Sequence, residues 1–359
     1  LNLFPSFYSL TFKDMSFEKE KFLDFSLRES LFRKEKNFKD SFINYIYFAM
    51  KTDFPTVFLE KFDDMQKLNS NLNKLKKKLI ITKVSHVWNE RFKMWAAEMT
   101  TKQAKLHIAC HGGFLPFKMN SVFTHEKNIA DKYLSWHEAK EKKIVRLSPV
   151  QLLKNKNVNI NKQSCLILNW NVCRHLTNLL SLPYAAQYKI CFKNLSEMIE
   201  NLNPRIKEKS IYRTHEVDFG LQTNKKISKK FKKIKIQESS GGTKLIDEMK
   251  NARLVISSHP STSVSESIAA DIPTIIVFPE KLFNLTRESK KILNNLKKSK
   301  IYFNNPLEAS RHINKIWDNP DIWWRSSSTK KSLDKLKKFA FEVKDDWLDE
   351  WTSHVRKNI

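Results

Sequence analysis

Short apolar runs alternate with amphipathic segments along most of the chain after residue 78. Residues 79–82 form one such run. The segment that follows, 88–101, places Phe92, Trp95 and Met99 on one side of a helix. Strands that alternate with helices in this way build parallel sheets that are covered on both faces. The pattern therefore predicts an α/β protein.

The apolar runs fall into two groups, which predict two sheets. The first group of predicted strands is 79–82, 105–110, 133–136 and 144–147. The second group is 165–170, 210–215, 234–237, 254–257, 274–278 and 301–303, with helices at 184–201, 244–252, 263–270 and 290–298. Repeated strand–helix spacing is typical of a doubly wound, Rossmann-like sheet. Between two of these elements, the Lys-rich run 225–235 is interpreted as an exposed loop.

The same pattern predicts the domain organisation. Residues 1–150 combine a helical extension with a first Rossmann-like domain, and 151–306 form a second one. Residues 307–359 are helical and rich in Trp, and we expect them to pack back across both domains. Because the chain begins with Leu1 rather than Met, a truncated N-terminal domain is one interpretation.

The net charge of the chain is compatible with several classes of anionic partner. Lys and Arg number 65 against 38 Asp and Glu, a net charge of +27 that attracts phosphates, nucleic acid and anionic membranes. However, the excess is mostly Lys, and Asn is abundant while Gly is scarce, which also arises from A/T-rich coding. No zinc finger, aromatic RNA-binding motif or KH loop is present. Nucleic acid is therefore an unlikely partner, and an anionic membrane surface remains a candidate.

Cysteine and histidine spacing argues against a resident metal. The four Cys are not paired at ligand spacing, so we interpret them as free thiols in a reducing compartment. His107, Cys110 and His111 lie close together, but no second ligand cluster accompanies them. No run reaches the roughly 20 apolar residues of a spanning helix, and no secretory signal is visible. We expect a cytoplasmic protein without metal or cofactor, peripheral to the inner membrane.

The segment 257–266, SSHPSTSVSE, carries the most specific chemistry. It is interpreted as a strand end, a hydroxyl-rich turn and a helix start, and a helix start favours phosphate. Ser263 and Glu266 have capping-box spacing. The predicted donor-nucleotide ligands here are Ser258, His259, Ser261, Thr262, Ser263 and Glu266. The alternative is that the hydroxyls only cap a helix.

Only five glycines occur, so each one is informative. Gly112 and Gly113 follow a predicted strand and His111, where a loop can bring N–H groups to a ligand; we predict that both glycines bind the donor. Gly241 and Gly242 precede a helix but lack the spacing of a phosphate-binding P-loop. A tight turn is the alternative for any single glycine.

Arg213 lies near the end of the predicted strand 210–215, with Asp218 just beyond it. A planar guanidinium at a strand's carboxyl end suits a diphosphate, to which it donates paired hydrogen bonds. Asp218 is interpreted as orienting Arg213 or binding a sugar hydroxyl. A structural salt bridge is an equally good interpretation of the arginine.

Three blocks of sequence together resemble the GT-B-type transferases of bacterial surface-carbohydrate and O-antigen biosynthesis. The first block runs from FKMWAAE at 92–98 through His111-Gly112-Gly113 to DKYLSW at 131–136. The second is ARLVIS at 252–257, continuing through Glu266 to IPTII at 272–276. The third is HINKIWD at 312–318, with WW at 323–324 and DWLDEW at 346–351. Phe114 departs from the pattern, because family members tend to carry a further Gly there.

The resemblance implies a GT-B fold and a metal-independent glycosyltransferase that uses a nucleotide-activated sugar and a lipid-linked or glycan acceptor. It implies that Glu266 holds the ribose, and the His259-Pro260 pair is similar to an element of some transferases that use CMP-sugars. We expect Arg213 and the helix start at 261–263 to stabilise the leaving phosphate. His111 is the candidate for acceptor activation or leaving-group contact, with Asp218 and Glu98 as competitors.

Three other functions stay open. A polyol-phosphate transferase with a CDP-linked donor shares the fold type. A truncated, non-catalytic chain could serve as a scaffold in envelope assembly, and the Phe114 departure favours this slightly. The third is a protein that binds nucleic acid through its charge, which requires an affinity for duplex DNA that falls steeply as the salt concentration rises.

Overall fold

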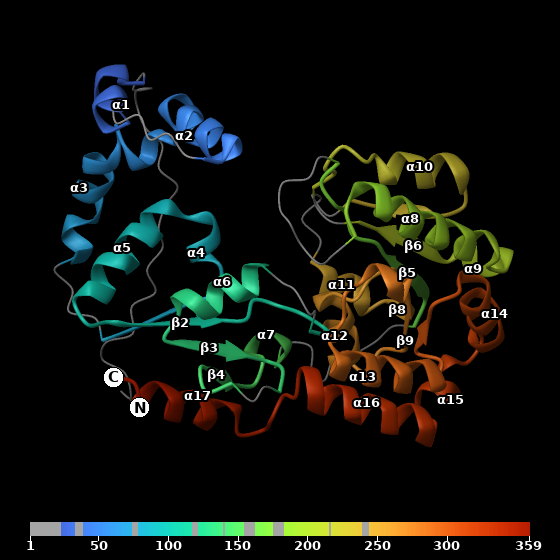
Figure 1. The fold of residues 1–359 in the computed structure, drawn as a ribbon. Helices are drawn as coiled ribbons and strands as arrows, with labels where there is room; N and C mark the ends of the chain where they lie inside the picture. The colour runs from blue at the N-terminus through green and yellow to red at the C-terminus, as the bar shows by residue number, and fades with distance from the viewer. Residues whose placement is uncertain are drawn as a thin grey trace. The chain divides into compact units, whose positions relative to one another are not determined.

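The computed structural model describes residues 23–32, 39–73, 78–116, 121–138, 141–153, 162–174, 183–214, 217–238 and 244–359. Gly241, Gly242 and residue 215 of the predicted strand lie outside them. The chain divides into two compact units, Leu1–Ala109 with Asn358–Ile359, and Cys110–Lys357. Figure 1 draws the helices and strands of both. The units therefore divide at residue 109, whereas the sequence predicts a boundary at residue 150.

The first unit begins with helices and continues into a strand–helix–strand segment. Its elements are α1 (Phe25–Leu31), α2 (Ser41–Asp53), the 3-10 helix η1 (Thr56–Phe58), α3 (Phe62–Asn73), β1 (Leu79–Thr82), α4 (Ser85–Trp88), α5 (Glu90–Thr101) and β2 (Lys105–Ala109). Strand β1 pairs with β2 in parallel, with Leu79 opposite Lys105. Helix α3 packs against α5, and each contributes a buried side chain, Met65 and Trp95. The helical extension is therefore present over its described residues.

One buried arginine ties the first helices together. Arg28 on α1 donates to both carboxylate oxygens of Glu60, at 2.6 and 3.0 Å. It also donates to the carbonyls of Lys51, Thr52 and Phe54 at and after the end of α2, at 2.9–3.3 Å. A single side chain thus closes the open carbonyl end of α2 and fixes α1 beside it.

The second unit contains a parallel pair of strands, a larger sheet and the C-terminal helices. The elements before the larger sheet are α6 (Ser121–Ile129), β3 (Lys132–Ser135), β4 (Ile144–Arg146) and α7 (Val150–Leu153). The strands of the larger sheet are β5 (Ser164–Leu168), β6 (Ser210–Arg213), β7 (Lys235–Gln237), β8 (Ala252–Ser257), β9 (Thr274–Val277) and β10 (Tyr302–Phe303). Its helices are α8 (Ala185–Glu200), α9 (Pro204–Glu208), α10 (Thr223–Lys230), α11 (Leu245–Met249), α12 (Thr262–Ala269), η3 (Glu280–Leu282), α13 (Arg287–Lys298), α14 (Pro306–Ile316), α15 (Pro320–Trp324), α16 (Ser327–Ala340) and α17 (Trp347–Arg356).

The larger sheet is parallel throughout and has the strand order β10-β9-β8-β5-β6-β7. The chain starts at β5 in the middle, builds outward to β7, returns to β8 beside β5 and builds outward again to β10. This is the doubly wound order. The α/β fold with parallel sheets is confirmed. Helix α10 corrects one detail, because most of the Lys-rich run 225–235 is helical rather than a loop.

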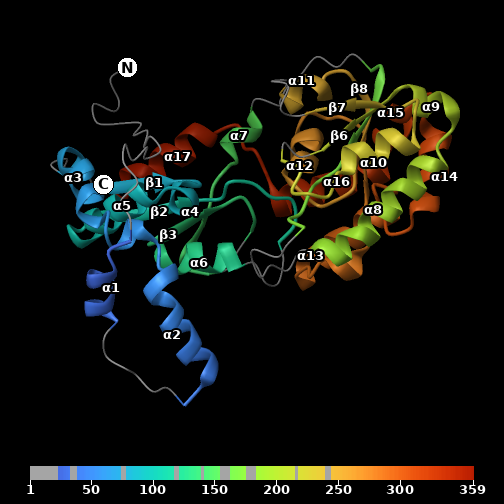
Figure 2. The same cartoon turned by 90° about the horizontal axis from the view of Figure 1, so that it is seen from above.

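Alternate residues of the buried strands face two separate apolar clusters. Cys165 and Ile167 of β5 belong to one cluster, which helices α8 and α14 also build. Leu166 and Leu168 belong to the other, which Met249 of α11 joins. The period of two along a strand explains this division, and Figure 2 shows helices on both sides of the sheet. Strands β5 and β9 are buried over their whole length, and after a first hydroxyl residue, Ser164 or Thr274, each is a continuous apolar run.

The C-terminal helices bind Glu138, Arg146 and Ser148 within the second unit. Phe339 and Lys338 of α16 accept from the Glu138 backbone N–H, at 3.1 Å, and from the Arg146 side chain. Glu350 and Trp351 of α17 bind the backbone of Ser148 at 2.8 and 2.9 Å. These bonds explain why residues 110–150 belong to the same compact unit as the C-terminal helices.

Candidate functional site

The reversal of strand order lies between β5 and β8. Leu168 of β5 stands opposite Arg213 of β6 and Ser257 of β8, so the three strands end at the same level. In a doubly wound sheet, ligands bind outside the carboxyl ends of the strands, at this reversal. The residues that follow β5 and β8 are therefore the first place to look for a site.

Helix α12 starts at this edge, directly after β8. Its N-cap is Ser261, and the helix begins at Thr262, so the predicted capping box with Ser263 as the cap is wrong. Among the described residues the Ser261 side chain caps no helical N–H, and its hydroxyl instead lies 2.7 Å from that of Ser263. The first turn thus keeps its N–H groups and partial positive charge at the sheet edge, an arrangement that favours an anion.

The Gly112–Gly113 loop packs directly on this first turn. The backbone N–H of Gly113 donates to the Thr262 hydroxyl at 3.0 Å, and the Ser265 hydroxyl donates to the Gly113 carbonyl at 2.7 Å. A Cβ at Gly112 would lie 2.3 Å from the Thr262 Oγ1, and Gly113 has a φ of +149°. Both glycines are therefore required by close packing. His111, next to them, is exposed.

His137 lies against the other side of this loop. A Cβ at Gly113 would approach the His137 ring at 3.3 Å. The His137 Nε2 is buried and has no hydrogen-bond partner in the described part of the chain. Burial lowers the pKa of His137 to about 4, so the ring is neutral at pH 7. His137 is not among the site residues predicted from the sequence.

A buried polar network crosses the reversal between β5 and β8. The Asn169 amide donates to the hydroxyls of Tyr188 and Tyr212 at 2.7 and 2.8 Å. The Ser258 hydroxyl donates to the Asn169 Oδ1 at 2.6 Å. Burial raises the pKa of both tyrosines, which keeps them protonated. Ser258 is buried in this network, so it positions the two strand ends.

Two aromatic rings stack across the same reversal. His259 and Trp170 lie nearly parallel, with 14° between the planes and 5.4 Å between the ring centroids. The Ser257 hydroxyl donates to the His259 carbonyl at 2.9 Å and fixes the turn. Trp170 also contacts Phe283, at 6.0 Å between centroids. The stack places a flat surface beside the helix start.

Arg213 ends β6 and forms a buried ion pair with Glu248 of α11. Burial raises the pKa of Glu248, although the guanidinium opposes this shift. The Asp218 carboxylate accepts from the backbone N–H of Gln222, at 2.9 and 3.1 Å. These bonds give both residues a structural contact, and the ligand contacts expected of them remain predictions.

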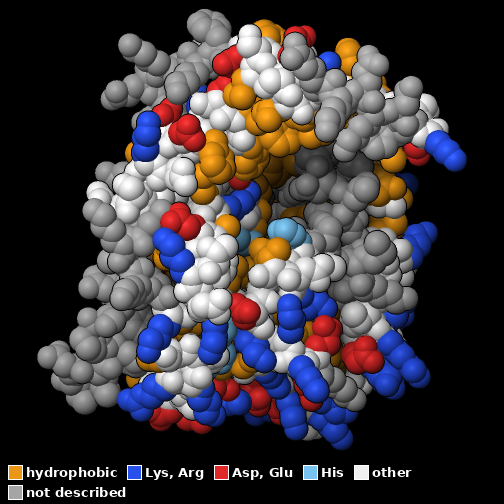
Figure 3. All heavy atoms as spheres, turned by 60° about the vertical axis from the view of Figure 1, so that its left-hand side comes forward, with side chains coloured by type: hydrophobic (Ala, Val, Ile, Leu, Met, Phe, Trp, Pro, Cys, Tyr) orange, Lys and Arg blue, Asp and Glu red, His pale blue; other side chains and the backbone are white. Residues whose placement is uncertain are grey.

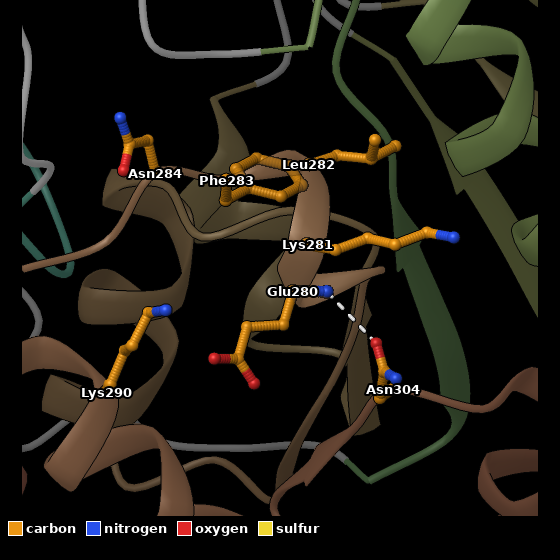
Figure 4. Close-up of a pocket in the computed structure, with 7 residues that line it drawn as sticks. All are labelled: Glu280, Lys281, Leu282, Phe283, Asn284, Lys290 and Asn304. Carbon is orange, nitrogen blue, oxygen red and sulfur yellow. Dashed lines mark hydrogen bonds between the residues drawn. The ribbon is translucent and has the colours of Figure 1, made fainter.

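A cavity of about 560 Å³ lies at the carboxyl ends of β9 and β10, and Phe283 lines it from the side of the aromatic stack. Figure 4 shows its lining residues and the hydrogen bond of 3.0 Å from the Glu280 N–H to the Asn304 Oδ1. Its other lining residues are Lys281, Leu282, Asn284 and Lys290. The lining is mainly polar and carries charges of both signs.

The described residues contain neither a metal site nor a membrane-spanning helix. No group of three His, Cys, Asp or Glu side chains in the described ranges is placed to hold a metal ion. Within the same ranges no helix has the length and apolar character needed to span a membrane. The four cysteines are free, and three of them are buried.

The structure thus brings most of the predicted donor ligands together in the second unit. Gly112 and Gly113 meet Thr262 on α12, and Ser258 and His259 lie just before that helix. Arg213 lies on β6, the strand next to β5, and the backbone N–H of Asn169 just after β5 donates to the Arg213 carbonyl at 2.9 Å. Sequence reasoning missed Asn169 and Trp170, although polar residues directly after a buried strand are a usable signal.

Several solved structures are similar to this chain at low sequence identity. The chain is similar to a UDP-GlcNAc 2-epimerase from Neisseria meningitidis bound to UDP-GlcNAc, at 6% identity and a TM-score of 0.45 over 92% of this chain and 87% of that one. It is similar to S. aureus MnaA solved with UDP, at 8% identity and 0.48 over 83% and 78%. It is also similar to Acinetobacter baumannii MurG, at 11% identity and 0.41 over 83% and 77%. No curated protein matches the sequence.

The sequence model of the LIC12162 family transferases matches residues 1–355, nearly the whole chain. The predicted membership of a transferase family is confirmed. This chain belongs to the LIC12162 family of transferases.

Proposed function

We propose that the chain is a glycosyltransferase that takes a sugar from a nucleotide donor and builds cell-surface polysaccharide of the O-antigen type. The observation that carries the proposal is the start of α12 at the strand reversal, where the first turn faces the sheet edge and the glycine loop packs on it. Family membership supports group transfer. A CMP-linked sugar is the first donor to test, because His259-Pro260 follows β8.

The start of α12, Glu266 and the three predicted catalytic residues each have a role in this proposal. The N–H groups at Ser261–Ser263 and the Arg213 guanidinium stabilise negative charge that develops on the leaving phosphate. Glu266, half-exposed on α12, holds the ribose hydroxyls. Asp218 binds a sugar hydroxyl. His111 is exposed at the loop and accepts the acceptor's proton or contacts the leaving group.

The acceptor in this proposal is a lipid-linked or glycan chain, and the enzyme works on the cytoplasmic face of the inner membrane. The net charge of +27 supports attraction to anionic lipid there. The donor site needs neither metal nor cofactor in this mechanism, because backbone N–H groups and Arg213 supply the positive charge.

The first experiment is a thermal-shift panel with CMP, CDP, UDP, GDP and dTDP on the wild type and on Glu266→Ala. A ligand at 100 times its dissociation constant adds about 2.7 kcal/mol of stability. We expect a shift for one nucleotide that Glu266→Ala removes and Glu308→Ala retains, since Glu308 is an exposed residue in the first turn of α14. No shift with any nucleotide would overturn the donor site.

Product analysis then separates the transferases. Transfer of a glycosyl group forms a glycosidic bond and releases the nucleotide with its phosphates, whereas a polyol-phosphate transferase forms a phosphodiester from a CDP-linked donor and releases CMP. A CMP-linked sugar also releases CMP, so the bond in the product decides between the two. The His111→Ala and Arg213→Ala variants are both expected to lower turnover. Unchanged turnover in both would make the assignment of the catalytic residues wrong.

A further inference from the structure

Helices α13 and α16 lie side by side in the second compact unit and pack against each other (Figure 1). The Ser332 hydroxyl of α16 donates to the Asn295 carbonyl of α13 at 3.3 Å. Each helix buries one side in the fold, where Leu296 of α13 and Leu336 of α16 are fully buried. Because an α-helix repeats every 3.6 residues, the opposite side of each one faces solvent.

The solvent-facing sides carry almost only positive charge. Helix α13 has five Lys and Arg residues between Arg287 and Lys298, and α16 has five Lys residues between Lys330 and Lys338. Nine of the ten are exposed, and the tenth is half-buried. We call these ten side chains the α13–α16 face. In Figure 3, Lys and Arg side chains gather along the lower edge of the view, at the height that α16 has in Figure 1.

The charge of the α13–α16 face is not neutralised by neighbours. Its two helices contain only two acids, Glu288 and Asp334, and across the described ranges neither these acids nor the ten cations form an ion pair. The Lys-rich helix α10 differs, because Lys230 pairs with Glu200 at 2.9 Å. The α13–α16 face is therefore the stronger attractor of anions.

The stability of the two helices does not account for these cations. Arg287 is the first residue of α13, where the partial positive charge of a helix start opposes a cation. Arg287 and Lys291 are four residues apart, as are Lys331 and Lys335, so like charges are neighbours on each helix. Such pairs destabilise an isolated helix. An anionic partner would relieve this repulsion.

An anionic bilayer is the partner that these side chains fit. Nine of the ten are Lys, which supplies a point charge rather than the planar fork with which Arg recognises nucleic acid. The charge is spread over helices of 12 and 14 residues, roughly 18 and 21 Å long. Clusters of Lys and Arg on amphipathic helices are typical of surfaces that bind anionic lipid headgroups. The lipid-linked acceptor of the proposed function is presented at such a bilayer.

We propose that the α13–α16 face docks the protein on an anionic lipid bilayer, with the two helices against the headgroups. The inference rests on the proposed function for the choice of a bilayer, and it goes beyond that function by assigning the contact to one surface. Vesicle binding is measured without nucleotide. It can therefore fail while nucleotide binding holds, and nucleotide binding can fail while vesicle binding holds.

The test is co-sedimentation of the full chain with vesicles of phosphatidylglycerol and phosphatidylcholine, and with phosphatidylcholine alone. We expect binding to the anionic vesicles that weakens as salt rises, and much weaker binding to the neutral ones. The variant Lys291→Glu/Lys298→Glu/Lys331→Glu/Lys335→Glu changes four exposed residues of the α13–α16 face. It is expected to weaken binding at least about a hundredfold, because each cation near an anionic surface contributes roughly fivefold.

The matched control is Lys225→Glu/Lys226→Glu/Lys229→Glu/Lys232→Glu, which changes the net charge equally at exposed lysines of α10 and just after it. Figure 1 shows α10 and α16 at opposite ends of the second unit. Charges farther from the bilayer than about 10 Å are largely screened, so this control is expected to weaken binding less than about fivefold.

Two further measurements make the result decisive. All variants must keep the thermal unfolding midpoint of the wild type, and a Lys→Gln version of the face variant, which keeps good helix formers, is expected to show a smaller loss of binding. The proposal is overturned if the wild type does not prefer anionic vesicles, if the face variant binds them equally, or if the α10 control loses as much. Tighter binding to a short DNA duplex at the same salt, lost in the face variant, would also overturn it in favour of nucleic acid.

Discussion

Each compact unit contains a buried Arg–Glu pair, yet the two pairs differ in how completely their hydrogen bonds are made. Arg28 reaches both oxygens of Glu60 and three backbone carbonyls, and Glu60 accepts further from the Asp24 N–H at 3.0 Å. Glu248 has one oxygen on Arg213, while its Oε2 is buried with no partner in the described residues. The fold therefore supplies hydrogen bonds to both carboxylate oxygens of Glu60, whereas one carboxylate oxygen of Glu248 has no partner in the described residues.

The pKa values of the two carboxyl groups reflect this difference. Hydrogen bonds from Arg28 lower the pKa of Glu60 from 4.5 to about 2, against the opposing effect of burial. Burial raises the pKa of Glu248 despite Arg213 beside it. A buried charge that is poorly compensated is a feature of functional sites. We therefore interpret Arg28–Glu60 as structural and Arg213–Glu248 as a pair that an anionic ligand can open.

The largest effect is expected from Arg28→Ala. It leaves Glu60 buried without its cation and opens the end of α2, so we expect a loss of about 3 kcal/mol or more in the free energy of unfolding. Urea denaturation followed by circular dichroism measures this. Arg325→Ala is the control, because its pair with Asp271 is exposed and long, at 3.8 Å, and we expect about 0.5 kcal/mol. Equal losses in the two variants would contradict a structural role for the first pair.

A slightly smaller effect is expected from Glu60→Gln, and it depends on pH. A carboxyl whose pKa is lowered by folding stabilises the fold above its unfolded pKa, and this contribution disappears as pH falls toward the folded value of about 2. The shift corresponds to roughly 3 kcal/mol at pH 7. Thermal midpoints of wild type and variant should therefore differ at pH 7 and converge as pH falls below about 4.5. A difference that stays constant with pH would show that charge is not involved.

The sequence predicts the strands well because a buried strand consists largely of apolar residues that are neighbours in the chain. Strand β1 has the predicted bounds, 79–82, and the strands of the larger sheet overlap their predictions since each one contains apolar residues. The doubly wound order follows from repeated strand–helix spacing. The helix start after β8 was also found, although its cap was placed at Ser263 instead of Ser261 because competing hydroxyls are indistinguishable in sequence.

The side-chain network at the strand reversal could not be predicted in the same way. Asn169, Tyr188, Tyr212 and Ser258 meet only because β5, β6, β8 and α8 converge, and they are up to 89 residues apart in sequence. Likewise, nothing near Arg213 in the chain indicates Glu248, which lies 35 residues later. The exposure of α2 could not be predicted either, because its apolar residues fit a buried helix equally well.

A moderate effect on stability and a large effect on nucleotide binding are expected from Arg213→Ala. Glu248 is left unpaired, but its raised pKa lets it protonate more readily, so we expect a loss of about 1–2 kcal/mol in stability. The nucleotide-induced thermal shift is expected to fall far more than it does in Arg28→Ala. If Arg213→Ala instead costs as much stability as Arg28→Ala and leaves the shift intact, then Arg213 is a structural residue.

The smallest effect on stability is expected from Glu248→Gln. A carboxyl whose pKa is raised by folding opposes folding while it is ionised, so an amide of the same size should change stability by less than about 1 kcal/mol at pH 7. The sign of the pH dependence is opposite to that of Glu60: the wild type should gain stability relative to Glu248→Gln as pH falls through the raised pKa. Thermal midpoints from pH 8 to pH 5 measure this. If Glu248 competes with the phosphate of the donor for Arg213, Glu248→Gln should also bind the preferred nucleotide more tightly than wild type. Weaker binding, together with a loss as large as that of Glu60→Gln, would make both pairs structural and remove the contrast between them.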